Sequence, residues 1–406
     1  MNNTPATALF SDPTEIFIFF AALIGFIFYI SEKKYVKKIF DVLPFVFWIY
    51  FLPMVSTTIG ITPDSSPLYK WISRYILPTS LILLFLSANI PAIMKLGPKA
   101  LITMLTGSFG IVIGAPIAYF FMRSLFPPLT WKGIGALAGS WIGGSANMTA
   151  IKESLNTPMD IFTPLTIVDV IVGYGWMAIV VALSIFQQRF DKWNKADTTL
   201  LVEVNERMRQ IELSRSKPLI TSKLLVMIGL SFTIAILCIK VGYAIGGHIE
   251  KAIPQISYIF TSFTIVVILV TIIGIILSFT KWSELEDYGA SKVGYGMFYI
   301  LLASIGAQAN LNQIVKAPLY IVMGLIWLSI HILCLFLLIR IFKIPMFFAA
   351  TASQANIGGP VSAPIVAAVY QPSLAVVGLL MAILGNILGT FLGLFTAYIC
   401  SLLAVG

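Results

Sequence analysis

Charged residues are scarce in this sequence. Only 11% of the 406 residues are charged, 58% are hydrophobic, and the mean hydropathy is +0.95. A soluble core cannot bury that much apolar surface, so the composition indicates an all-α, polytopic membrane protein. The net charge of +9 would suggest nucleic acid in a soluble protein. Here the basic residues lie between apolar runs, where they set membrane topology, and we expect no nucleic-acid partner.

Cysteine and histidine are also rare, with three and two copies. Cys238, Cys334 and Cys400 lie far apart in apolar segments, which excludes a disulfide framework or a redox motif. The sequence has no Walker loop, no nucleophile-and-base arrangement and no His/Cys cluster. We therefore expect no enzyme, no ATP-driven pump and no cofactor other than a bound Na⁺.

Twelve apolar segments are long enough to span a bilayer core of about 30 Å. They cover residues 14–30, 42–61, 73–94, 99–123, 131–155, 160–187, 219–247, 257–280, 294–315, 317–341, 346–369 and 372–403. The first segment follows acidic residues and precedes lysines, unlike a secretory signal, so we expect a retained helix.

A polar stretch divides the chain into two membrane halves. Residues 188–218 are predicted to be a cytoplasmic linker between an N-terminal repeat, 1–187, and a C-terminal repeat, 219–406. In the linker Leu201, Val204, Met208 and Ile211 recur at helical spacing. They indicate either an amphipathic helix on the membrane surface or a solvated linker.

The two halves resemble each other. SANIPAIMK at 87–95 and QANLNQIVK at 308–316 share an Ala-Asn pair and a Lys at the same spacing. Each is followed by an apolar segment and then by a Gly-Gly stretch. This shared order predicts an internal repeat.

Two Gly-Gly stretches interrupt apolar segments at corresponding places. They read GSWIGGSANMTAIKESL at 139–155 and TASQANIGGPVSA at 351–363, and the second contains Pro360. Helices should break there, and paired broken helices point to a transporter's binding site. If both segments are re-entrant hairpins, each half crosses five times and the halves are inverted. With the N-terminus outside, most basic residues, including those at 33–38, then lie inside. A broken helix that crosses the membrane is the alternative.

Backbone groups freed at a helix break must line a cavity or bind something. The polar residues near the breaks are uncharged and rich in oxygen, which suits Na⁺ better than a transition metal. The predicted cation ligands are Ser145, Asn147, Thr149, Gln354 and Asn356. The residues predicted to hold the solute are Gly143, Gly144, Ser353, Gly358, Gly359 and Asn386. Close helix packing through small residues is the alternative interpretation.

Asp169 is the most informative single residue. A charge in the middle of a membrane helix costs on the order of 3 kcal/mol, so such a carboxylate normally faces a cavity or binds a cation. We therefore predict that Asp169 binds the cation, with Asn386 as its rough counterpart in the last segment. The alternative is a hydrogen bond to a neighbouring helix. For His331, a neutral ring bonded to a backbone carbonyl is favoured over a proton relay.

The motifs together resemble a known family. LPTSLILLFLSANIPAIMKLGPKALI, GSWIGGSANMTAIKESL, TIVDVIVGYGW, LLASIGAQANLNQIVKAP and TASQANIGGPVSAPIVAA are similar to membrane proteins with the domain of unknown function 819, of the cation/proton antiporter and anion transporter superfamily. The resemblance implies a core of discontinuous segments, a second domain that often mediates dimers, and an elevator-like motion. It places cation and substrate near Asn147 and Asn356. Asp169 with Asn386 also resembles the acidic and amide pairs of cation/proton exchangers.

These observations predict a secondary active transporter of two inverted repeats, similar to the sodium/bile-acid symporters and of the elevator type. It would couple Na⁺ or H⁺ to movement of a small organic anion. The expected location is the plasma membrane, as in the bacterial inner membrane, and the expected partners are the solute, the coupling ion, the lipid bilayer and a second copy in a homodimer. The alternatives are a cation/proton antiporter that uses Asp169 and a non-transporting membrane scaffold or receptor.

Overall fold

The computed structural model describes residues 8–33, 35, 36, 39, 40, 43, 45–209 and 217–404. Within these residues the regular secondary structure is entirely helical. Ile211, and with it part of the predicted amphipathic pattern, lies outside the described residues, as does the side chain of Met208.

The first half of the chain contains nine of the labelled α-helices. They are α1 (Pro13–Ser31), α3 (Phe45–Thr58), α4 (Pro67–Trp71), α5 (Leu77–Leu86), α6 (Ile90–Met94), α7 (Pro98–Met122), α8 (Thr130–Gly143), α9 (Ser145–Ser154) and α10 (Met159–Leu183). A π-helical turn, Ile72–Ile76, joins α4 to α5.

The linker and the second half of the chain contain the other labelled α-helices. The linker holds α11 (Gln187–Asn194) and α12 (Thr199–Arg209). The second half holds α13 (Thr221–Ala252), α14 (Ser262–Ser278), α15 (Ala290–Ala307), α16 (Ala317–Ile341), α17 (Met346–Ile357), α18 (Gly359–Tyr370) and α19 (Ala375–Ala404).

Seven helical stretches in the described part of the chain are long and apolar enough to cross a membrane. They are Pro13–Ser31, Pro98–Leu125, Met159–Asn194, Thr221–Ala252, Ala290–Ala307, Leu311–Ile341 and Pro372–Ala404. The 17-residue α14, the 14-residue α3 and the run from α4 to α5 are shorter or interrupted apolar helices. The prediction of an all-helical polytopic membrane protein is confirmed.

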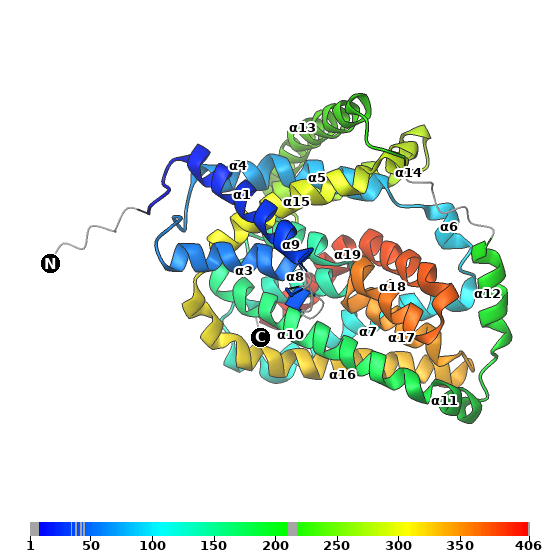
Figure 1. Ribbon diagram of the computed structural model, residues 1–406. Helices are drawn as coiled ribbons and strands as arrows, with labels where there is room; N and C mark the ends of the chain where they lie inside the picture. Colours follow the sequence, from blue (N-terminus) through cyan, green and yellow to red (C-terminus); the bar gives the residue numbers. More distant parts are fainter. Residues whose placement is uncertain are drawn as a thin grey trace.

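The helices form two packed groups (Figure 1). We call α7–α10 with α16–α19 the hairpin group, and α1 and α3–α5 with α13–α15 the companion group. Each group takes helices from both halves of the chain. In the companion group α3 packs on α15 and α5 on α14, and in the hairpin group α7 packs on α16 and α8 on α19. The two halves are therefore interleaved in space.

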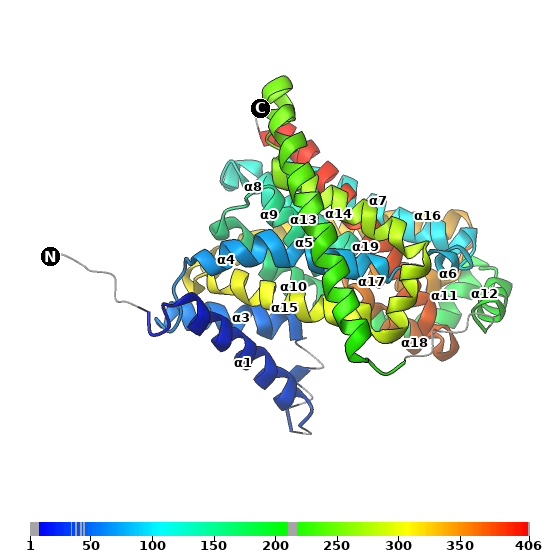
Figure 2. The same cartoon turned by 90° about the horizontal axis from the view of Figure 1, so that it is seen from above.

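The linker helices α11 and α12 lie at the opposite end of the molecule from α4 (Figures 1 and 2). Leu200, Leu201 and Val204 of α12 join an apolar cluster that contains residues of α17. The linker also bonds to the hairpin group, because the Asn194 amide donates to the Ile339 carbonyl in α16 at 2.9 Å and to the Ile344 carbonyl just before α17 at 3.2 Å. The described part of the linker is thus docked on the protein, which neither sequence interpretation anticipated.

Glycines allow α8 and α19 to pack with their backbones in close contact. The contact uses Gly135, Gly139 and Gly143 of α8 against Gly385, Gly389, Gly393 and Ala397 of α19. A Cβ atom added to Gly393 would lie 2.9 Å from the Gly139 backbone. Both helices carry their small residues every fourth position, the spacing that membrane helices use for close approach. The alternative that small residues serve packing therefore holds for this pair of helices.

We predict that Gly393→Ala destabilises the protein by about 1–3 kcal/mol, because the added methyl group overpacks a backbone contact that cannot yield easily. The check is thermal unfolding of the purified protein in detergent. Gly247→Ala in α13 is the matched control, since its Cβ atom would meet no atom within 4 Å. An equal melting temperature for the Gly393 variant and the wild type would contradict the close packing.

Candidate functional site

The first Gly-Gly segment forms a helical hairpin. Gly144 separates α8 from α9 with φ of +82°, a left-handed conformation that side chains rarely adopt. A Cβ atom on Gly139 would lie 2.4 Å from the Ile151 side chain. Twelve residues of continuous helix would hold these positions about 18 Å apart, so α9 folds back along α8.

The second segment forms a hairpin as well. Gly359, at φ of +66°, begins α18 after α17 has ended at Ile357. The Gln354 amide donates to the Ser362 hydroxyl at 2.9 Å across the hairpin, whereas eight residues of straight helix span about 12 Å. The two tips touch, because a Cβ atom on Gly359 would lie 3.8 Å from the Gly144 Cα.

A cavity of about 120 Å³ lies at the hairpin tips, between the two helix groups. The hairpin group contributes the tips, α10 and α19. The companion group contributes an aromatic and apolar wall from α3, α5 and α15. The predicted site residues that line it are Gly143, Gly144, Ser145, Asn147, Asp169, Gly358, Gly359 and Asn386.

Two oxygen atoms of the cavity residues are buried without a hydrogen-bond partner among the described residues. They are Asp169 Oδ1 and Asn386 Oδ1. The other carboxylate oxygen of Asp169 accepts a bond from the Ser140 hydroxyl at 3.0 Å. Asn386 Oδ1 lies 3.6 Å from the Cβ position of Gly144, which places it beside a hairpin tip. Unpartnered buried oxygens are costly, and a hard cation or a proton would satisfy them.

Two helix N-termini also meet at this cavity. The 10-residue α9 begins at Ser145 and the 12-residue α18 begins at Gly359. The first backbone N–H groups of a helix have no intrahelical partner and carry partial positive charge. Such ends favour anionic groups. The cavity therefore offers oxygen acceptors for a cation next to donors for an anion.

Asn147 lines the cavity, yet its polar atoms are already used. Its amide donates to the Gly143 carbonyl at 2.7 Å and to the Asn386 carbonyl at 3.1 Å. Its side-chain oxygen accepts a bond from the Thr390 hydroxyl. These contacts fasten the tip of the first hairpin to α19. Asn147, which was predicted to be a cation ligand, thus forms contacts that position the hairpin tip on α19.

Four predicted site residues lie outside the cavity: Thr149, Ser353, Gln354 and Asn356. Thr149 is buried on α9. Gln354 bonds across the second hairpin, as described above. Asn356 accepts from the Ser108 hydroxyl at 2.8 Å and donates to the Ala352 carbonyl at 3.0 Å. It therefore holds α17 against α7 and does not line the cavity.

Ser353 belongs to a buried hydrogen-bond chain with His331. The Nδ1 atom of His331 lies 2.8 Å from the Gly107 carbonyl, which can only accept, so Nδ1 carries the proton. Nε2 lies 2.9 Å from the Ser353 hydroxyl, and this hydroxyl accepts a bond from the Trp176 indole at 2.8 Å. If the ring is neutral and Nε2 accepts from the Ser353 hydroxyl, every donor and acceptor in this series of hydrogen bonds has a partner. The geometry matches the neutral, carbonyl-bonded histidine favoured from the sequence.

The aromatic wall and the hydrogen-bond partners of the polar residues were not predicted from the sequence. Tyr295, Phe298 and Tyr299 face the cavity from α15. Their i, i+3, i+4 spacing in an apolar segment places them on one helix face, which is the signal that could have found them. Ser140 lies one turn before the break in α8, where only the tertiary contact with Asp169 shows its role.

We predict that Asn147→Ala lowers the melting temperature of the purified protein, because the substitution leaves buried carbonyl groups unpaired at about 1–3 kcal/mol each. The matched control is Asn312→Ala, at an exposed asparagine outside the hairpins. A melting temperature equal to that of the control would show that Asn147 does not fasten the hairpin.

Comparison with known proteins gives two matches. The family described as "Protein of unknown function (DUF819)" matches residues 18–403. The chain is also 25% identical over 327 residues to the uncharacterized membrane protein YjcL of Bacillus subtilis (strain 168), which covers 77% of this chain and 78% of that protein. Both matches agree with the multi-pass membrane architecture. The chain therefore belongs to the DUF819 family.

Proposed function

We propose that the protein is a secondary active transporter that couples Na⁺ or H⁺ to the movement of a small organic anion. The observation that carries the proposal is the pair of unpartnered oxygens, on Asp169 and Asn386, beside the touching tips of two helical hairpins. Unwound helix ends near the bilayer midplane are how transporters bind ions and anionic solutes. Asp169 lies near the middle of α10, and Asn386 lies well inside α19.

The arrangement of the hairpins supports two inverted repeats. The second hairpin starts at the linker end of the molecule, where the Met346 N–H donates to Asp191 of α11 at 2.8 Å. The first hairpin ends at the other side, where the Ser154 carbonyl accepts from the Thr261 hydroxyl at 2.7 Å, just before α14. Hairpins that enter from opposite ends and meet at their tips are what inversion of one repeat relative to the other produces.

The division into two helix groups supports alternating access by an elevator-like motion. One wall of the cavity belongs to the hairpin group and the other to the companion group. Among the described residues, the companion wall carries aromatic and aliphatic side chains and no charged residue. Sliding along such a surface breaks few directed bonds, whereas the polar contacts of Asn147 and Asp169 stay inside the hairpin group and would move with it.

A second candidate is cation/proton antiport with Asp169 as the exchanged carboxylate. The cavity volume of about 120 Å³ favours it, because pockets for organic ligands usually measure about 300–1,000 Å³. An ion with a few water molecules fits this volume, so an organic anion would require the two groups to separate further. In this mechanism the cation and the proton compete for the same oxygens of Asp169.

We predict that Asp169→Asn reduces ion-driven flux in proteoliposomes by at least about tenfold, since a charged contact of about 1.5–3 kcal/mol is lost and each 1.4 kcal/mol is a factor of ten. The variant should stay folded, because it removes a buried charge. Asp160→Asn is the matched control on the same helix: its carboxylate is about half exposed and pairs with Lys316 at 3.4 Å. Wild-type flux in the Asp169 variant would overturn the proposed role of this carboxylate.

The two candidates make opposite predictions in vesicles without organic solute. For the symporter, we expect an imposed Na⁺ gradient to move no protons, as followed by a pH-sensitive dye inside proteoliposomes. For the antiporter, the same gradient should acidify or alkalinise the lumen according to its direction, and Asp169→Asn should abolish the signal. Ion-driven proton movement without solute would therefore replace the first candidate with the second.

A further inference from the structure

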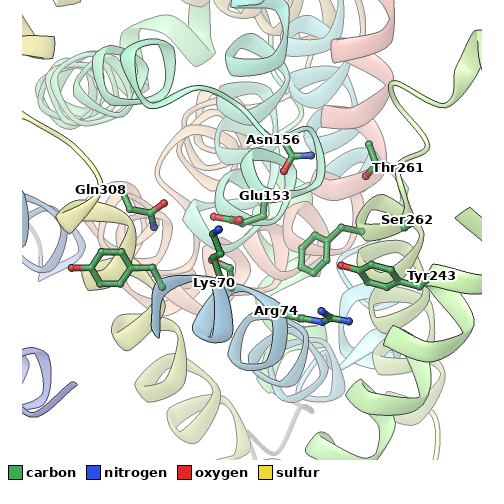
Figure 3. Close-up of a pocket in the computed structure, with 11 residues that line it drawn as sticks. Lys70, Arg74, Glu153, Asn156, Tyr243, Thr261, Ser262 and Gln308 are labelled. Atoms are coloured by element: carbon green, nitrogen blue, oxygen red, sulfur yellow. The ribbon is translucent and has the colours of Figure 1, made fainter. Parts of the chain in front are cut away.

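A second and larger cavity lies where α4, the end of α9, α13 and the start of α14 meet. Its volume is about 460 Å³, and it shares no residue with the cavity at the hairpin tips. Figure 3 shows it between the π-helical turn after α4, the end of α9 and the helix α13. Its walls therefore come from both helix groups. The residues used below are Lys70, Arg74, Glu153, Tyr243, Ser262 and Gln308.

Two basic side chains dominate the charge of this cavity. Lys70 and Arg74 are one helical turn apart, which places them on the same face at about 5–6 Å between Cβ atoms. Neither forms an ion pair with a carboxylate of the described residues. Glu153 is already paired with Lys152 at 2.7 Å. When Glu153 is counted together with its partner Lys152 as neutral, Lys70 and Arg74 leave the described lining of the cavity with a positive charge.

The remaining lining suits an anion with a carbon skeleton. The Arg74 guanidinium stacks over the Tyr243 ring, 4.9 Å from its centroid, which orients the charged group within the cavity. The 17-residue α14 begins at Ser262 in the cavity wall, so its N-terminal dipole adds partial positive charge. Gln308 offers an amide, and the rings of Tyr69 and Phe263 offer apolar contact.

We propose that this cavity binds an organic dicarboxylate and is the entry site for the anionic solute, an assignment whose place on the transport path rests on the proposed function. Two cations one turn apart match two carboxylates separated by a short carbon chain. Helix α9 connects the two cavities, with Ser145 at the inner one and Glu153 at the outer one, about 12 Å apart along the helix. A bound dianion would contact both helix groups, so its release would accompany their relative movement.

The test measures binding without transport. Full-length purified protein in detergent is titrated with succinate at constant ionic strength, set with choline chloride, and binding is followed by the rise in melting temperature. We expect Lys70→Gln/Arg74→Gln to weaken succinate binding by at least about tenfold, since charge-assisted bonds are the strong ones. The matched control is Lys240→Gln/Lys251→Gln, which removes two exposed charges from α13 outside the cavity. Lys70→Arg should retain binding.

The outcomes separate the site from the transport mechanism. Asp169 does not line this cavity and the titration measures no flux, so a failure of the proposed transport function in the flux assay does not decide the outcome for Lys70 and Arg74. The proposal is overturned if succinate does not stabilise the wild type, or if the control double variant loses as much affinity as the Lys70/Arg74 variant. It is also overturned if inorganic phosphate stabilises the protein as strongly as succinate, because the cavity would then bind anions without regard to a dicarboxylate.

Discussion

This structure depends on one constraint: backbone N–H and C=O groups in hydrocarbon must have hydrogen-bond partners. The chain breaks two helices inside apolar stretches, at Gly144 and Gly359, and each break frees N–H and C=O groups. Both breaks turn the chain back as a hairpin, and the tips touch. The free backbone groups of each tip are therefore shielded from lipid by the other hairpin, and they face the cavity that the two tips share.

Close packing keeps the tips in place. The glycines of α8 and α19 let two backbones approach each other, so the first hairpin is held along most of its length. Asn147 adds polar bonds to α19 at the tip itself, and Gln354 bonds to Ser362 across the second hairpin. The polar residues nearest the breaks thus divide into two kinds. Asn147 and Gln354 form hydrogen bonds that hold the hairpins. Asp169 and Asn386 each keep one oxygen atom without a hydrogen-bond partner at the cavity.

Charge links the two proposals. The inner cavity combines one carboxylate with two helix N-termini, and the outer cavity carries two unbalanced basic side chains. In the proposed function a cation at Asp169 removes the repulsion that this carboxylate exerts on an anion beside it. Each ligand then improves the site for the other, which is the reciprocal coupling that symport requires. The outer basic residues would raise the local concentration of the anion before it reaches this site.

Three features could be recognised from the sequence: the apolar runs, the two Gly-Gly stretches and the lone Asp169. Each depends on local composition and on the cost of polar groups in lipid. They determined the helical membrane architecture, the helix breaks and the polar and glycine residues of the cavity, but not its aromatic and apolar wall. The sequence did not show that Asn386 lines the cavity while Asn356 and Ser353 do not. Which side of α17 faces the cavity follows from its packing against α7 and α16. No pattern in the local sequence distinguished the outer pair, Lys70 and Arg74, as binding residues. Their cavity exists because α4, α9, α13 and α14, which are remote in sequence, meet there, and that meeting was decided by the tertiary structure alone.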